Sequence, residues 1–440
     1  MFFYRNPLKW VQEQKIIGED NNALLGWNAV KYNEQQGILA VSYTTDDTLG
    51  NEAGSVILYK EGASGFEEVQ RIYNSEDLEP AGDRFGYQLD FNEQKNLLFV
   101  SAYRDDLNGT DSGTVFVYAS GSQGYHRVQT LTASGDTAPE SDYFGFRSIS
   151  TDESGEILAI GSAYDDVNGE NKAGSVYIFQ SSSAGYQQVQ KLTAGEDFNT
   201  DQDRFGIEVR ISRSGDTIAV AATRDENNLP TGSAWIGSVY VFQSSSNGYV
   251  QSQNITSSYQ PTDPYNSENG TGTESLLFGT DILFSSDEQT LFVCAPYEKS
   301  GEVLGEGALY IFEKDQNGNY QETKKISSPE PPLMNRGKEF GHTVLDNSQF
   351  LFIGATSEIY DPSLPNYLGR SGCVYIYEKS NGDYVFKEKI FGDENALGAR
   401  GGYGRPVVTT EDKLIIKNTH GDGEGQDVGE IYIYKYTRDY

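Results

Sequence analysis

Short apolar stretches of strand length recur along the chain at an almost constant interval. The most regular of them are Leu97–Ala102, Ile157–Ala163, Ile218–Ala222, Leu291–Ala295 and Leu351–Ala355. Segments that contain Gly, Asn, Asp and Ser lie between these stretches, and each stretch is too short for a typical helix. Such runs favour β-strands that are covered on both faces.

A dipeptide of a large apolar residue and Gly marks the start of each interval. It occurs seven times, as Leu25-Gly26, Phe85-Gly86, Phe144-Gly145, Phe205-Gly206, Phe278-Gly279, Phe340-Gly341 and Tyr403-Gly404. The glycines are 60, 59, 61, 73, 62 and 63 residues apart, and the long interval holds a polar insertion at 257–275. Each unit contains a short strand, the apolar strand, a third strand that starts at Gly, and a more polar fourth strand. Seven units of four strands predict an all-β, seven-bladed β-propeller with antiparallel blades.

The two ends of the sequence complement each other. The last unit, 403–436, has only three predicted strands, whereas residues 9–17 hold a single strand, Trp10–Ile16, without a unit of its own. That strand is similar to the fourth strand Tyr186–Leu192. We therefore predict that the N-terminal strand 9–17 completes the blade formed by 403–436, so that residues 1–440 form a single propeller domain without an open edge.

Composition supports this fold and limits the partners. Aromatic residues make up 12 % of the chain, which favours strands, and there are 48 Gly for turns. The net charge of −32 argues against nucleic acid and against an anionic membrane surface, because phosphate binding needs a basic footprint. It is compatible with cation binding, with a basic partner or with solubility alone. Cys294 and Cys373 are expected to be buried and unpaired.

The repeats resemble the FG-GAP family, which includes the integrin α-subunit propeller and many bacterial surface proteins. The resemblance rests on the seven dipeptides, on GAP-like segments such as Cys294–Tyr297, and on Gly174–Phe179. It implies a seven-bladed propeller that presents loops to a partner. Integrin repeats can carry a calcium loop between the first and second strands, but the corresponding loops here, such as 92–96, lack the required oxygens. We therefore do not predict the integrin calcium site in this chain.

A different acidic loop recurs between the second and third strands. Its two fullest copies, 105–111 and 165–171, supply the candidate Ca²⁺ ligands Asp105, Asp106, Asn108, Asp111, Asp165, Asp166 and Asn168. Clustered carboxylates followed by Gly suit a hard cation. The alternative is that these side chains cap the turn through bonds to the backbone. The sequence leaves both interpretations open.

Catalytic motifs are absent from the sequence. His126, His342 and His420 lie in separate repeats, and no nucleophile elbow, zinc-binding helix or phosphate loop is present. We expect a non-catalytic binding or assembly module that contacts protein or glycan through its loops, chiefly 257–275, 359–369 and the acidic loops. The alternatives are a propeller enzyme that acts on polysaccharide and a calcium-stabilised adhesion module.

The location follows less directly from the sequence. No apolar run is long enough to span a bilayer, and the first residues lack the apolar region of a signal peptide. The family's usual place is a cell surface. We therefore expect a component of a cell surface, a virion or another large assembly, with a cytoplasmic protein as the alternative.

Overall fold

The structure is a computed structural model of the chain. It describes residues 9–18, 24–75, 80–135, 140–195, 202–226, 235–259, 275–301, 303–330, 337–358, 372–392, 403–419 and 429–437. These residues form strands β1 to β28 and no helix. A membrane-crossing helix is accordingly not found among them.

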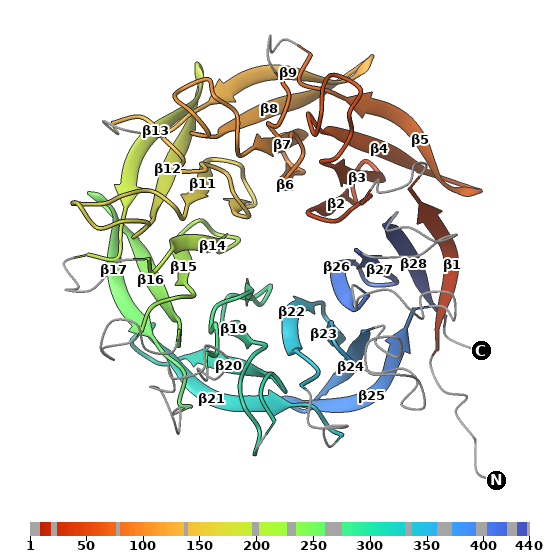
Figure 1. The fold of residues 1–440 in the computed structure, drawn as a ribbon. Coiled ribbons are helices and arrows are strands. Elements are labelled where there is room, and N and C mark those ends of the chain that lie inside the picture. The colour runs from red at the N-terminus through yellow and green to blue at the C-terminus, as the bar shows by residue number, and fades with distance from the viewer. Residues whose placement is uncertain are drawn as a thin grey trace.

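The strands form seven four-stranded antiparallel sheets around a central channel (Figure 1). Blades 1 to 3 contain β2 (Val30–Asn33), β3 (Ile38–Tyr43), β4 (Ser55–Gly62), β5 (Gly65–Ile72); β6 (Leu89–Asn92), β7 (Leu97–Ala102), β8 (Thr114–Gly121), β9 (Gly124–Leu131); and β10 (Ile149–Thr151), β11 (Ile157–Ser162), β12 (Ser175–Ser182), β13 (Gly185–Leu192). Blades 4 to 6 contain β14 (Phe205–Ile211), β15 (Thr217–Ala222), β16 (Ser238–Ser245), β17 (Gly248–Ile255); β18 (Ile282–Phe284), β19 (Thr290–Ala295), β20 (Ala308–Lys314), β21 (Tyr320–Ser327); and β22 (Phe340–Asp346), β23 (Phe350–Ala355), β24 (Cys373–Ser380), β25 (Asp383–Phe391). Blade 7 contains β26 (Arg405–Thr409), β27 (Lys413–Asn418), β28 (Glu430–Thr437) and β1 (Lys9–Ile17). The predicted seven-bladed propeller is confirmed.

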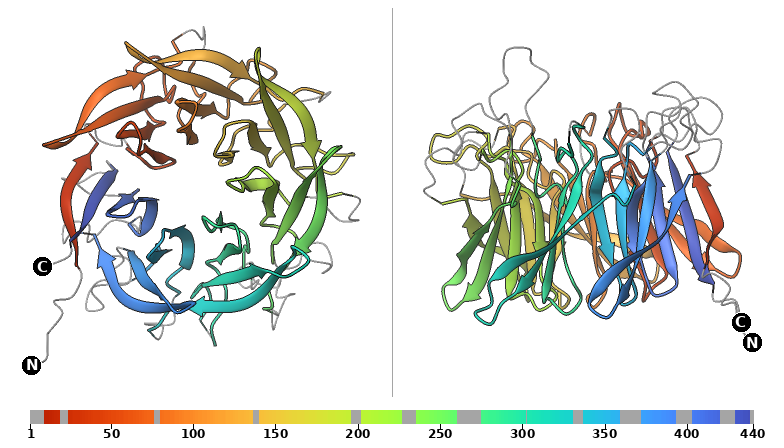
Figure 2. Two further views of the ribbon diagram at one scale, coloured as in Figure 1. Left: turned by 180° about the vertical axis from the view of Figure 1, so that it is seen from behind. Right: turned by 90° about the horizontal axis from the view of Figure 1, so that it is seen from below.

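The N-terminal strand closes the ring, as predicted. β1 pairs antiparallel with β28, with Trp10 opposite Tyr436 and Gln14 opposite Ile433. The Trp10 indole lies edge-on to Phe352 of blade 6, with ring centroids 5.5 Å apart. The first strand in sequence therefore supplies the outer strand of the last blade, as the view of the ring from behind also shows (Figure 2).

The recurring dipeptide links each blade to the preceding one. Phe205 is fully buried, and its amide donates a hydrogen bond of 2.9 Å to the carbonyl of Ala173 in blade 3. Gly174 follows at φ +88°, and a Cβ there would lie 2.1 Å from the Phe205 oxygen. The same approach occurs at every interface, at Gly54, Gly113, Gly237, Gly307, Gly372 and Gly429. The dipeptide and the Gly before the third strand thus form one inter-blade contact.

Outer strands are connected by a repeated side-chain contact. At five interfaces the side-chain amide of a Gln contacts the backbone of the aromatic residue at or next to the start of the next outer strand. It donates to the carbonyl and accepts from the backbone amide of that residue, at 2.6–3.0 Å. The pairs are Gln14 and Phe66, Gln70 and Tyr125, Gln129 and Tyr186, Gln190 and Tyr249, and Gln253 and Tyr320. Lys324 occupies the corresponding position of blade 5 and pairs with Asp383. The ring is therefore held at both its inner and its outer circumference.

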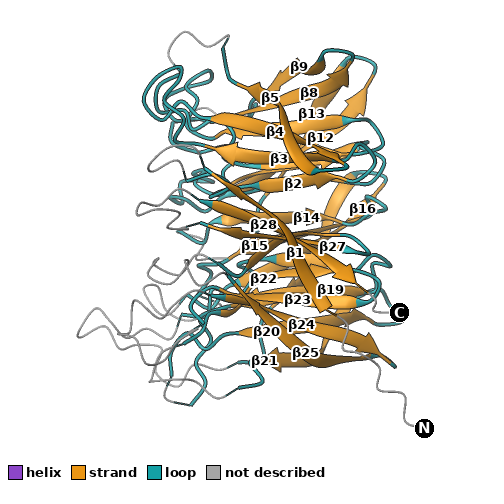
Figure 3. Cartoon of the chain, turned by 90° about the vertical axis from the view of Figure 1, so that its right-hand side faces the viewer, coloured by secondary structure: helices purple, strands orange, loops and turns teal. Residues whose placement is uncertain are grey.

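The two faces of the propeller differ in their connections. The FG dipeptides and the loops from each second to each third strand lie on one face, which we call the FG face, and the tight turns from each first to each second strand lie on the other (Figure 3). The cysteines are not on either face. Cys294 and Cys373 are both free and fully buried, as expected from the sequence.

Candidate functional site

A cavity of about 420 Å³ occupies the central channel. Its wall is built mainly from the one or two residues that follow the FG dipeptide in each of the seven blades. They are Trp27, Asn28, Tyr87, Gln88, Arg147, Glu208, Thr280, Asp281, His342, Thr343, Arg405 and Pro406. The dipeptide is nearly constant, but these positions differ in every blade. The backbone scaffold is thus repeated from blade to blade, whereas the side chains that line the cavity differ between blades.

Lys417 is the most unusual member of the wall. It comes from β27, at the position where the other six blades have a small residue: Ser42, Ser101, Gly161, Ala221, Cys294 and Gly354. Its ammonium group is buried and donates hydrogen bonds to the carbonyls of Trp27 (2.8 Å) and Asn28 (2.7 Å) in blade 1. Burial, and then the charge of Arg405, holds the pKa of Lys417 well below its usual range. No carboxylate among the described residues forms an ion pair with it.

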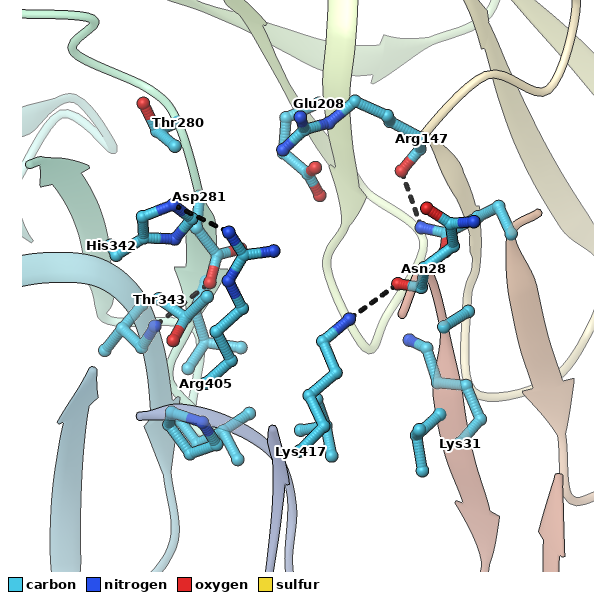
Figure 4. Close-up of a pocket in the computed structure, with 18 of the residues that line it drawn as sticks. Asn28, Lys31, Arg147, Glu208, Thr280, Asp281, His342, Thr343, Arg405 and Lys417 are labelled. Carbon is cyan, nitrogen blue, oxygen red and sulfur yellow. Dashed lines mark hydrogen bonds between the residues drawn. The ribbon is translucent and has the colours of Figure 1, made fainter. Parts of the chain in front are cut away.

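Two arginines face the same space (Figure 4). One guanidinium nitrogen of Arg405 lies 3.4 Å from Nε2 of His342. Burial, followed by repulsion from Arg147, lowers the pKa of Arg405 to about 10. Arg147 is exposed and sits at φ +66°, a conformation that costs a non-glycine residue energy. In the described part of the chain, neither arginine has a carboxylate within ion-pair distance.

His342 does not add charge to the cavity at neutral pH. Burial, followed by the charge of Arg405, lowers the pKa of its imidazole well below the usual value. The ring is therefore neutral beside the guanidinium. Because the neighbouring cations suppress its protonation, we count His342 as a hydrogen-bonding group rather than a cation.

The acidic residues that line the cavity, Glu208 and Asp281, are paired. Glu208 forms an ion pair with Arg210, and the second guanidinium nitrogen of Arg210 lies 3.1 Å from Asp281. Lys31 pairs with Asp90 at 3.1 Å. Burial raises the pKa of Glu208 to about 7, and it also raises the pKa of Asp281. Arg210 therefore compensates Glu208 and Asp281, whereas Arg147 and Arg405 have no carboxylate within ion-pair distance in the described part of the chain.

The residues predicted as calcium ligands lie away from the channel, in FG-face loops. Asp105 accepts hydrogen bonds from the Leu107 amide and the Thr114 hydroxyl, both at 2.9 Å. Asp106 accepts from the Asp111 amide at 2.6 Å, and the Asn108 side chain donates to the carbonyl of Ala133 at 3.0 Å. The loop 105–111 thus uses its oxygens to shape the turn.

The second copy of the loop contains a buried ion pair. Asp165 accepts from the hydroxyls of Ser175 and Tyr177 and lies 2.7 Å from the Lys191 ammonium. Asp166 accepts from the Lys172 amide at 2.8 Å, and Asn168 has a positive φ of 56°. Among the described residues no group of three or more His, Cys, Asp or Glu side chains is arranged to hold a metal ion. Calcium binding stays a prediction.

Other predicted contact regions fall partly or wholly outside the described residues. Of the insertion 257–275 only 257–259 and 275 are described, and the loop 359–369 and His420 are not. None of the channel residues except His342 was singled out in the sequence. A comparison of the residues that follow each dipeptide across the seven repeats would have found them.

The fold and the repeats define the class of protein: a seven-bladed β-propeller with a polar central cavity. More specifically, two of its segments are FG-GAP repeats, because the model of the FG-GAP repeat matches residues 125–179 and 186–242. Each match begins in an outer strand, passes through the dipeptide and ends in the third strand of the next blade. No curated protein matches the sequence.

Solved structures resemble the chain at very low sequence identity. A "putative 6-phosphogluconolactonase" from Bacteroides uniformis is 11 % identical with a TM-score of 0.52, over 83 % of this chain and 85 % of that one. A functionally unknown protein from Desulfotomaculum acetoxidans is 10 % identical with a TM-score of 0.48, over 86 % and 91 %. The first of these likenesses shows the propeller fold and nothing about activity.

Proposed function

We propose that the protein is a non-catalytic binding module that holds an anionic group of a protein or glycan partner in its central cavity. The observation that supports this proposal is the convergence of Arg147, Arg405 and Lys417 without carboxylate partners, in a chain whose net charge is −32. Lys417 is buried, and a buried charged group that lacks a counterion is costly, so an anionic ligand would supply the missing partner. A role within a cell-surface or virion assembly is part of the same proposal.

The absence of catalysis is proposed because both cavity acids are engaged. Glu208 and Asp281 are held on the single guanidinium of Arg210, so neither is positioned to activate water independently. Purified protein should therefore bind without converting the ligand.

A small monoanion tests the proposal directly. Calorimetric titration with D-galacturonate should show binding, whereas neutral D-galactose should not bind. Arg147→Gln should weaken galacturonate binding by roughly tenfold or more, the usual worth of a charge-assisted hydrogen bond. Arg213→Gln is the matched control, because Arg213 lies on the other face and pairs with Glu153. Equal affinity for both sugars would refute the proposal, and so would an unchanged galacturonate affinity in Arg147→Gln.

One observation favours a second candidate, a hydrolase that acts on an anionic sugar. Glu208 is buried in the cavity and has a pKa of about 7, which suits a general acid or base. Turnover of a polysaccharide or a sugar lactone that Glu208→Gln abolishes, with binding retained, would establish this activity in place of simple binding.

A further inference from the structure

Five aromatic side chains gather beside the cavity on the FG face, over blades 2 and 3. We call this group the aromatic platform: Tyr87, Tyr103, Tyr143, Phe146 and Tyr164. Neighbouring ring centroids are 4.4–6.3 Å apart. All of these rings except that of Tyr103 are only partly buried. A cluster of partly exposed rings is unusual on the surface of a soluble protein and indicates a contact surface.

Arginines border the platform and stack on aromatic rings. The guanidinium of Arg204 lies 4.5 Å from the centroid of Tyr164, and that of Arg104 lies 5.5 Å from Tyr103. Farther round the face, Arg224 lies 4.0 Å from the ring of Trp235. In the part of the chain that is described, none of these three arginines forms an ion pair with a carboxylate.

The positive charges of neighbouring arginines here are close enough to repel one another. The pKa of Arg204 is lowered by burial and then by Arg147, and the pKa of Arg224 is lowered by burial and then by Arg204. The chain has 65 acidic and only 33 basic residues, so random placement would give most arginines an acidic neighbour. These arginines gather here without ion-pair partners among the described residues, which suits a surface that binds anions from outside the chain.

The platform continues directly into the cavity. Tyr87 lines the cavity and also stacks on Phe146, with ring centroids 5.1 Å apart and planes 24° apart. Arg147 follows Phe146 in the chain and faces the cavity (Figure 4). A ligand with one group in the cavity can therefore extend over the platform without leaving the surface.

We propose that this combined surface binds an acidic oligosaccharide, with one sugar carboxylate in the cavity and the following sugar rings on the aromatic platform. This inference rests on the proposed anion-binding function and adds the ligand class. A uronic acid polymer carries one carboxylate per ring, and each ring has an apolar C–H face that packs on an aromatic side chain. An acidic peptide would supply the carboxylates but has no flat apolar face for the tyrosines.

The experiment compares tetragalacturonate with monomeric galacturonate by calorimetry, with a chelator present to remove divalent cations. Wild-type protein should bind the tetramer at least ten times more tightly than the monomer. Arg204→Gln and Tyr164→Leu should each bring the affinity for the tetramer down to that for the monomer while leaving monomer binding unchanged. Arg213→Gln should alter neither affinity. Fully methyl-esterified tetramer should not bind, because its carboxylates are masked.

The possible failures are distinguishable. Equal affinity for tetramer and monomer would overturn the platform and leave the cavity proposal standing. Tighter binding of tetraglutamate than of tetragalacturonate would replace the glycan with an acidic peptide and refute the inference. Loss of monomer binding in Tyr164→Leu would mean that this variant disturbs the cavity. The result for Arg204→Gln, which keeps the aromatic side chain of Tyr164, would then decide whether the platform binds the tetramer. Failure of wild-type protein to bind any of these anions would overturn both proposals.

Discussion

A methyl group added at Gly174 should destabilise the ring far more than one added at Gly169. Both glycines have the same backbone conformation, with φ of +88° and +90°. The hypothetical Cβ of Gly174 would lie 2.1 Å from the oxygen and 2.7 Å from the nitrogen of Phe205, whereas that of Gly169 has no neighbour within 4 Å. The pair therefore separates the cost of backbone strain from the cost of forcing two blades apart.

The expected sizes follow from these contacts. Alanine with a left-handed backbone costs about 1–2 kcal/mol, and this cost applies to both variants. Gly174→Ala must additionally move backbone atoms of the next blade, since the contact is with main chain and not with a flexible side chain. Overpacking of this kind adds about 1–3 kcal/mol, and weakening the 2.9 Å bond from Phe205 to Ala173 adds about 1 kcal/mol. Gly174→Ala should thus lose about 3–6 kcal/mol and Gly169→Ala about 1–2 kcal/mol.

Urea unfolding followed by tryptophan fluorescence measures this difference. Heat is less suitable, because the unfolding entropy of so long a chain makes 1 kcal/mol correspond to only about 1 °C. The midpoint should fall clearly further for Gly174→Ala at an unchanged slope. If the two variants lost the same free energy to within about 0.5 kcal/mol, the close approach of blades would not be a source of stability.

Three further outcomes are expected. Gln190→Glu should lower the free energy of unfolding by about 1–3 kcal/mol because a carboxylate cannot donate to the Tyr249 carbonyl, and exposed Gln187→Glu should change it little in the same urea assay. Anion binding should tighten as the pH falls through about 7, because Glu208 then gains a proton and the cavity becomes more positive. Calorimetry on Glu208→Gln should show an anion affinity that depends less on pH. An unchanged pH dependence in this variant would contradict the assignment. Chelator should leave the melting temperature unchanged, because the Asp165 carboxylate is already bound by Ser175, Tyr177 and Lys191, whereas a loss of several degrees would restore the calcium interpretation.

The blade number and the closure of the ring could be predicted because both depend on local patterns. The dipeptide, the turn glycines and the apolar second strands repeat at one period, and each pattern is read within about 60 residues. The complementary ends predict the pairing of β1 with β28, which the structure contains. The role of the acidic loops could not be predicted from such patterns. Asp165 is buried beside Lys191, and this contact depends on a partner from another strand of the blade. A carboxylate in a turn has the same local pattern whether it caps, pairs or binds a metal.

By itself the sequence determined the architecture, since strand period, turn chemistry and repeat length are local properties that hold wherever the segment lies. Only the tertiary structure decided the cavity. Its wall takes one or two residues from each blade, and Lys417 meets Asn28 across 389 positions of sequence. Such residues become neighbours only when the ring closes. Their effect on one another, including the lowered pKa of Lys417, arises from charges and burial that ring closure creates.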